Sequence, residues 1–197
     1  IGVRLVGSEM CIRDRPYTLR WPKERTEYIS CFCCPPNTLR TLCQAQNYAY
    51  TLGSEGIYCN LYGANTLTTN WKDKGEIALT QKTAYPWEGN VRVEFDRVPR
   101  KAGAFSLFLR IPEWCEKAML TVNGELVPVA AKANTYAEVK RTWKKGDVVE
   151  WVMDMPVRLL EAHPLAEEIR NQVVMKRGPL VYCLESMDMT CLLYTSD

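Results

Sequence analysis

The chain has 197 residues, of which 47% are hydrophobic and 24% are charged, and its formal net charge is +2 at pH 7. This composition is typical of a globular protein, and the small net charge, with its dispersed Lys and Arg residues, argues against a nucleic-acid partner. No apolar run approaches the roughly 18 residues that cross a membrane, so no membrane partner is expected either.

The two ends of the chain differ from the rest. DNA strings that would encode residues 10–14 and residues 191–196 are reverse complements of each other where they overlap. Such a pair arises when the same transposon end of a sequencing library is read in both orientations. We therefore expect residues 1–15 and 191–197 to be adapter-derived and not native, and the remainder to be an internal fragment. A signal peptide is the alternative, but Arg4 breaks the apolar run and no small-residue cleavage site follows. Localisation is then unknown, because the native N-terminus is missing.

Cysteine is the compositional outlier, with nine residues in the chain. Seven lie between the two end segments, and three of these crowd into the motif SCFCCPPN, residues 30–37. An odd, clustered set differs from the even, spaced framework of a disulfide-stapled secreted domain, so we expect reduced thiols. A cytoplasmic or periplasmic location is expected over a disulfide-bonded extracellular one.

The motif places Cys33 and Cys34 directly before two prolines. Pro35 and Pro36 fix φ, and at a tight turn before a helix both sulfur atoms can reach one small ion. A helix N-terminus favours negative charge, and thiolates are preferred ligands of zinc. Two adjacent cysteines are not a complete zinc site, and His163 is not expected to complete it, so buried structural thiols stay an alternative on spacing alone.

One helix is expected after the prolines. Residues 37–53 carry apolar side chains at helical intervals, with Asn37 as the N-cap and Gly53 as the stop. Cys43 falls on the apolar face and is expected in the core. Since no long linker follows, the helix is expected to pack directly against the next domain. One helix cannot bury its apolar face alone, so further partners are expected upstream of residue 16.

Beyond Gly53 the apolar period shortens to two and turn signals recur, which is typical of many short strands. Asn123-Gly124 is the strongest hairpin signal. The expected strands are residues 56–63, 76–83, 91–98, 104–112, 117–124, 125–131, 135–143, 147–155, 171–178 and 179–185. The expected fold class is therefore mainly β, with a β-sandwich or jelly-roll-like region over residues 54–190.

Several motifs, in order along the chain, resemble glycoside hydrolase family 127 and its near relatives, the β-L-arabinofuranosidase group. They are CFCCPPN before a helix, IYCNLY, TAYPWEGNV, FSLFLRIPEW, LTVNGE, RTWKKGDVVE and RGPLVYCLE. The resemblance covers almost all of the chain between the end segments. It implies that residues 16–53 end an (α/α)6 barrel catalytic domain. The expected fold is then a β-sandwich that follows the last helix of a truncated (α/α)6 barrel.

The resemblance also implies roles for the paired cysteines. Cys33 is similar in position to the family's nucleophile and zinc ligand, and Cys34 to a residue that is a zinc ligand only. The implied reaction is retaining hydrolysis through a thioglycosyl intermediate, with Zn2+ as cofactor and an arabinose-containing oligosaccharide or glycan of the plant cell wall as partner. The family's remaining zinc ligands and its acid/base glutamate lie upstream of this motif, so the chain alone is expected to be inactive. Oligomeric state is left open.

Other residues carry weaker expectations. Cys31 is a lesser candidate for a third ligand, because the resemblance assigns the other cysteine ligand elsewhere. Trp87 and Trp114 could stack on sugar, although aromatic residues at strand ends are more often core or interface residues. The cysteines expected to be buried packing residues are Cys59, Cys115 and Cys183.

Two alternatives from other classes stay open. One is a non-catalytic β-sandwich carbohydrate-binding module, which predicts exposed tryptophans along a groove and no metal dependence. The other is a metal-binding or redox protein that uses the cysteine cluster, which predicts metal bound by this chain alone.

Overall fold

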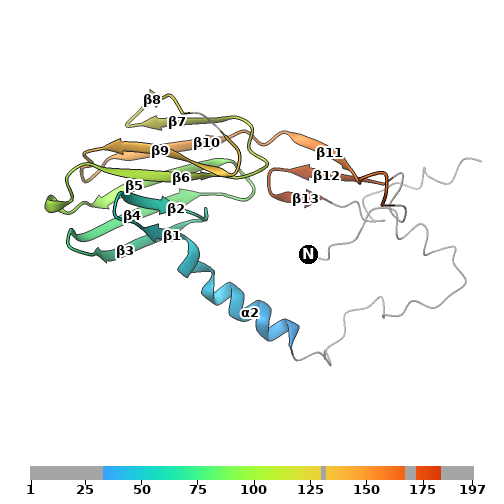
Figure 1. The fold of residues 1–197 in the computed structure, drawn as a ribbon, viewed down its shortest axis with the longest axis horizontal. Coiled ribbons are helices and arrows are strands. Elements are labelled where there is room, and N and C mark those ends of the chain that lie inside the picture. Colours follow the sequence, from blue (N-terminus) through green and yellow to red (C-terminus); the bar gives the residue numbers. More distant parts are fainter. Residues whose placement is uncertain (1–32, 130–131, 167–171, 183–197) are drawn as a thin grey trace, which may run out of the picture. The chain divides into compact units, whose positions relative to one another are not determined.

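The computed structural model describes residues 33–129, 132–166 and 172–182 (Figure 1). The expectations for residues 1–15, residues 191–197, Cys31 and Cys183 therefore lie outside the described residues. Two compact units are present: residues 36–156 form one, and the described residues from 157 onward belong to the other together with residues 33–35.

The helical segment consists of α2 (Cys34–Gln44) and a 3-10 turn, η1 (Ala45–Tyr48). The prediction that Asn37 caps the helix is wrong, because the helix begins before the prolines. The first N–H groups of a helix have no intrahelical acceptor, so proline in the first turn costs no hydrogen bond. Asn37 is helical instead, and its carbonyl accepts a hydrogen bond from Thr41 Oγ1 at 2.9 Å.

The predicted end of the helix at Gly53 is also wrong. The helical segment stops at Tyr48, and β1 (Tyr50–Leu52) pairs with β2 (Gly56–Cys59) in an antiparallel ladder. Tyr50 and Leu52 also pack against the hydrophobic core. Pairing with β2 therefore outweighs the helical spacing of the last apolar residues in the predicted helix.

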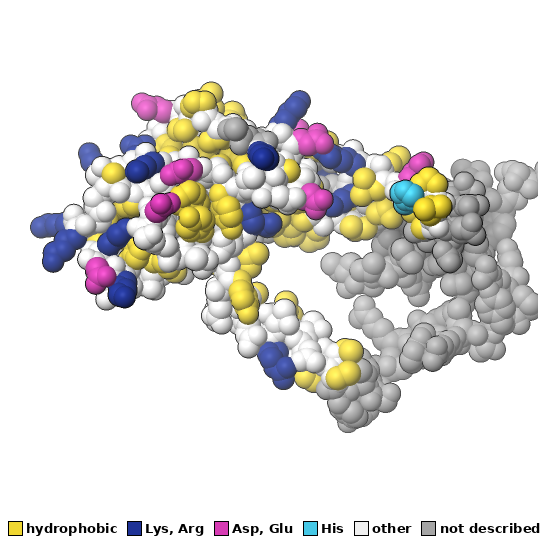
Figure 2. Space-filling model, viewed as in Figure 1, with side chains coloured by type: hydrophobic (Ala, Val, Ile, Leu, Met, Phe, Trp, Pro, Cys, Tyr) yellow, Lys and Arg dark blue, Asp and Glu magenta, His cyan; other side chains and the backbone are white. Residues whose placement is uncertain are grey.

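The apolar face of α2 is exposed. None of its residues is buried, and Leu39 and Leu42 keep 63% and 69% of their surface exposed. Cys43 is exposed too, so the expectation that it lies in the core is wrong for the described part of the chain. The helix does not pack closely on the domain that follows it, and Figure 2 shows apolar side chains on its surface.

Residues 50–153 form two sheets that share one core, as Figure 1 shows. The four-stranded sheet has the order β1, β2, β6 (Phe105–Ile111) and β9 (Thr135–Arg141). The six-stranded sheet has the order β3 (Asn65–Trp71), β4 (Gly75–Thr83), β5 (Asn90–Arg97), β10 (Val148–Met153), β7 (Ala118–Val122) and β8 (Glu125–Val127). Neighbours are antiparallel except β2 and β6, which are parallel. The predicted mainly β fold with a β-sandwich is confirmed.

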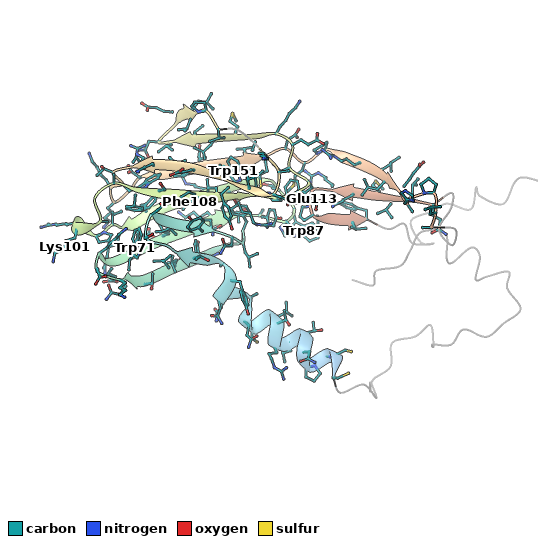
Figure 3. All side chains as sticks on the ribbon, in the orientation of Figure 1. Trp71, Trp87, Lys101, Phe108, Glu113 and Trp151 are labelled. Carbon is teal, nitrogen blue, oxygen red and sulfur yellow. The ribbon has the colours of Figure 1, made fainter. Side chains whose placement is uncertain are left out.

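The core follows the alternation that the sequence predicts. On β5, Val91, Val93 and Phe95 are buried and the residues between them are not. Phe95 stacks on Trp143 with ring centroids 4.3 Å apart, while Trp151 of β10 is fully buried (Figure 3). Strand β3 was not predicted, because Thr and Asn fill most of its positions and weaken the apolar signal.

The hairpin predicted at Asn123-Gly124 is confirmed. Val122 of β7 pairs with Glu125 of β8, and the two residues between them have φ values of 53° and 84°. The Asn123 side chain also links this turn to the start of β10. Its Oδ1 accepts the Val148 N–H at 2.8 Å, and its Nδ2 donates to Asp147 Oδ1 at 3.0 Å. One side chain therefore serves both the turn and the sheet.

We predict that Asn123→Ala lowers the free energy of unfolding by about 1–3 kcal/mol, because it removes two hydrogen bonds and puts Ala at positive φ. Asn123→Gly removes the same hydrogen bonds but tolerates the backbone, so it should cost less than Asn123→Ala. Urea denaturation of the three chains measures both effects. Equal stability of all three would contradict the role assigned to this side chain.

A separate three-stranded antiparallel sheet occupies the described residues from 157 onward. It consists of β11 (Val157–Glu161), β12 (Val173–Arg177) and β13 (Leu180–Tyr182), in that order. The predicted strands at 171–178 and 179–185 correspond to β12 and β13, and residues 183–185 lie outside the described residues. Strand β11 was not predicted, because its sequence, VRLLE, has two adjacent leucines and does not alternate between apolar and polar residues.

Candidate functional site

The paired cysteines lie at the start of α2. Cys34 is its first residue and Cys33 precedes it; both side chains are exposed, and their Sγ atoms lie 3.6 Å apart. Two thiolates that share one tetrahedral zinc ion, with Zn–S bonds of about 2.3 Å, are separated by about 3.8 Å. The observed separation therefore fits one edge of such a site. The structure brings these two sulfur atoms together, and their role as metal ligands stays a prediction.

The helix terminus adds a favourable electrostatic setting. Its first turn contains no acidic residue, so no carboxylate of that turn competes for the positive end of the helix dipole. Pro35 and Pro36 follow the thiols within that turn and restrict the backbone that carries them. The arrangement suits an anionic, metal-bound pair of sulfur atoms.

The other described cysteines do not suit metal or nucleophilic chemistry. Cys59 is completely buried, and burial raises the pKa of its thiol to about 12, so it stays protonated at neutral pH. Cys115 is buried as well; burial is the main cause that raises its pKa, and its Sγ donates to the Lys117 carbonyl at 3.4 Å. The prediction that both are packing residues is confirmed.

A complete metal site is not formed by the described residues alone. Within residues 33–129, 132–166 and 172–182, no three His, Cys, Asp or Glu side chains gather as a metal-binding group. His163 is exposed, and its Nδ1 accepts the N–H of Leu165 at 3.3 Å. Cys33 and Cys34 could therefore supply two of the four ligands that a tetrahedral zinc site needs.

Asn60 joins the helical segment to the sandwich, and the sequence did not reveal it. Its Nδ2 donates to the Tyr48 carbonyl at 3.3 Å and to Thr51 Oγ1 at 2.9 Å. Its Oδ1 accepts the Tyr136 O–H at 2.8 Å, and its carbonyl accepts Arg110 Nε at 2.5 Å. The alternating pattern predicts Asn60 within a strand over residues 56–63, but β2 ends at Cys59, and only the fold brings these four partners around Asn60.

The two tryptophans flagged as possible sugar contacts differ in exposure. Trp114 is half-buried and stacks on Tyr85, with ring centroids 6.5 Å apart and planes inclined by 22°. Trp87 keeps 57% of its surface exposed. Trp114 thus belongs to a packed aromatic cluster, whereas Trp87 presents its indole at the surface. No helix of the described residues has the length and apolar character needed to span a membrane.

Two family models match the chain. The Beta-L-arabinofuranosidase, GH127 middle domain, matches residues 56–155, and the Glycoside hydrolase family 127 C-terminal domain matches residues 157–195. Together they cover the sandwich from β2 onward and the separate three-stranded sheet.

Individual relatives agree with the family models. The non-reducing end beta-L-arabinofuranosidase of Bifidobacterium longum subsp. longum is 31% identical over 183 residues, which cover 89% of this chain and 26% of that protein. A solved glycoside hydrolase is 85% identical, with a TM-score of 0.84 over 90% of this chain and 29% of its own. The structure of a GH127 beta-L-arabinofuranosidase from Geobacillus stearothermophilus T6 is 38% identical, with a TM-score of 0.73 over 83% and 25%. The chain thus spans about a quarter of the length of these relatives.

Proposed function

Because the chain belongs to glycoside hydrolase family 127, we propose that the complete protein is a retaining glycoside hydrolase that releases L-arabinofuranose from plant cell-wall glycans. The observation that carries this proposal is the pair of Sγ atoms 3.6 Å apart at the start of α2. In the proposed protein, the helical segment that ends at Tyr48 closes an (α/α)6 barrel, and the sandwich begins at β1 instead of after residue 53. The arabinofuranosidases among the relatives support the choice of sugar.

Cys33 and Cys34 would hold a zinc ion, as their spacing and exposure allow. The ion, when bound, stabilises the thiolate form of both cysteines at neutral pH. Cys33 is the proposed nucleophile, on the resemblance of its motif. It precedes the first helical residue, and its exposed side chain can be approached by a substrate.

The proposed reaction has two steps. The Cys33 sulfur attacks the anomeric carbon of the arabinofuranose, forming an S–C bond as the glycosidic C–O bond breaks. The departing oxygen takes a proton from a carboxylic acid that lies outside the described residues. Water then attacks the same carbon, loses its proton to that carboxylate and returns the sulfur to its thiolate form. Two displacements at one carbon retain the anomeric configuration.

A direct assay tests this function. The complete protein is expected to release arabinose from a β-L-arabinofuranoside and to lose that activity when zinc is chelated. The 197-residue chain is expected to release none, because it supplies two thiols of the proposed site and no proposed acid/base. Arabinose release by this chain, or a complete protein that is inactive on every β-L-arabinofuranoside tested, would overturn the proposal.

A further inference from the structure

The loop between β4 and β5 holds Trp87 in a defined position. Thr83 Oγ1 accepts the Tyr85 N–H at 3.0 Å and donates to the Asn90 carbonyl at 2.6 Å, which closes the base of the loop. The Trp87 N–H donates to the Ala84 carbonyl at 2.9 Å. Backbone and side-chain hydrogen bonds therefore fix the loop on both sides of the indole.

The same loop is anchored to the sheet at Gly89. The Met153 N–H donates to the Gly89 carbonyl at 3.0 Å, and a Cβ at Gly89 would lie 2.0 Å from the Met153 carbonyl oxygen. Only glycine permits this approach. The loop is thus held against β10 as well as closed on itself.

Aromatic packing joins this loop to the one between β6 and β7. Tyr85 meets the buried Tyr62 edge to face with ring centroids 5.8 Å apart, and it also stacks on Trp114. The Tyr62 hydroxyl donates to the Arg110 carbonyl at 2.7 Å. The loops at 84–89 and 112–117 therefore lie together at one end of the sandwich.

This end presents one exposed aromatic ring among charged side chains. Of the described residues in these two loops, Trp87 is the one large apolar side chain that is exposed. Glu88, Glu113, Glu116 and Lys117 are exposed in the same loops. Figure 3 shows Trp87 and Glu113 toward the same end of the sandwich, away from Lys101.

The mixture of one indole and several charged groups favours a sugar over a protein partner. The buried cores of protein–protein interfaces are depleted of Glu and Lys, so a docked domain would leave these charges desolvated. A sugar ring offers an apolar C–H face that can stack on an indole, and its hydroxyl groups hydrogen-bond carboxylates and ammonium groups at the rim. A fixed loop also loses little conformational entropy when a ligand binds.

We propose that Trp87, with Glu88 of the same loop and Glu113 of the neighbouring loop, forms a binding subsite for a sugar residue of an arabinose-containing glycan, separate from the residue that is cleaved. The identity of the glycan rests on the proposed function. The subsite itself rests on the fixed loop and its exposed indole. It requires neither zinc nor a nucleophile.

Calorimetric titration of the 197-residue chain with soluble linear arabinan tests the subsite. We expect Trp87→Ala to weaken binding roughly tenfold or more, and Trp87→Phe to retain part of the affinity because a ring is kept. Leu126→Ala is the matched control, since Leu126 is 66% exposed on β8 and should leave binding unchanged. Circular dichroism confirms that each variant is folded.

Two results overturn the subsite: no binding of arabinan by the unchanged chain, or equal binding by Trp87→Ala and Leu126→Ala. The second is also the result expected if Trp87 serves only as a contact for another protein domain. Because binding is measured without catalysis, a complete protein that fails to hydrolyse arabinofuranosides overturns the proposed function and leaves a Trp87-dependent affinity standing. Conversely, if the complete enzyme is active but Trp87→Ala leaves the affinity for arabinan unchanged, only the proposed subsite is overturned.

Discussion

Replacing Cys33 by serine in the complete protein is expected to reduce arabinose release by a factor on the order of a thousand or more. A serine hydroxyl stays protonated at neutral pH and is a far weaker nucleophile than a thiolate. It is also a poorer ligand for zinc than a thiolate sulfur. The proposed site therefore loses both its nucleophile and one metal donor through a change of a single atom.

Cys43→Ser is the matched control for this experiment. Cys43 lies near the other end of the same helix, away from the paired thiols, so its replacement should leave arabinose release unchanged. Initial rates on an aryl β-L-arabinofuranoside, together with the zinc content of each purified protein, separate the two roles. Equal rates for Cys33→Ser and the unchanged enzyme would remove the nucleophile assignment. Unchanged zinc content with lost activity would remove only its role as a metal donor.

Gly56→Ala is expected to have the largest effect on stability. Gly56 pairs with Ser106 where the parallel strands β2 and β6 meet, and an added Cβ would lie 1.9 Å from the Ser106 carbonyl oxygen. The same Cβ would lie 3.1 Å from a ring carbon of Phe108. Backbone on a central strand pair cannot move without breaking ladder hydrogen bonds, so we expect a loss of about 4 kcal/mol or more in unfolding free energy.

Gly63→Ala is the control, because no heavy atom lies within 4 Å of the Cβ that it would add. Its effect should stay within about 0.5 kcal/mol, as for most surface substitutions. Thermal and urea denaturation of both variants measure the difference. A Gly56→Ala chain as stable as Gly63→Ala would show that β2 and β6 do not approach each other as closely as this structure has them.

Local sequence patterns determined much of the fold. Alternating apolar residues are enough to identify strands such as β5, because one face of each strand must be buried and the pattern records which one. Asn123-Gly124 identified its hairpin for a similar reason, since few residues tolerate positive φ at both turn positions. The adjacent thiols before two prolines likewise placed the candidate site at a helix start.

Tertiary structure decided what depends on distant partners. Leu52 continues the helical spacing of the residues before it, yet it lies in a strand because β2 offers a ladder to pair with. Asn60 links the helical segment to the sandwich only because the fold brings Tyr48 and Tyr136 beside it. A residue's neighbours in the chain do not record such long-range contacts, so no periodicity could reveal them.

The cysteines and tryptophans also show which properties the sequence predicts and which the fold decides. Their positions in the sequence identified Cys33 and Cys34 as a pair, but only the fold showed that Cys59 is buried enough to stay a neutral thiol. The sequence indicates the same role for Trp87 and Trp114, as aromatic residues at strand ends. The fold shows that they differ, because Trp114 packs against Tyr85 and Trp87 is exposed. Residue type and spacing determine which chemistry a side chain can perform. Burial and contacts, which arise only when distant strands meet, decide which side chains are placed to perform it.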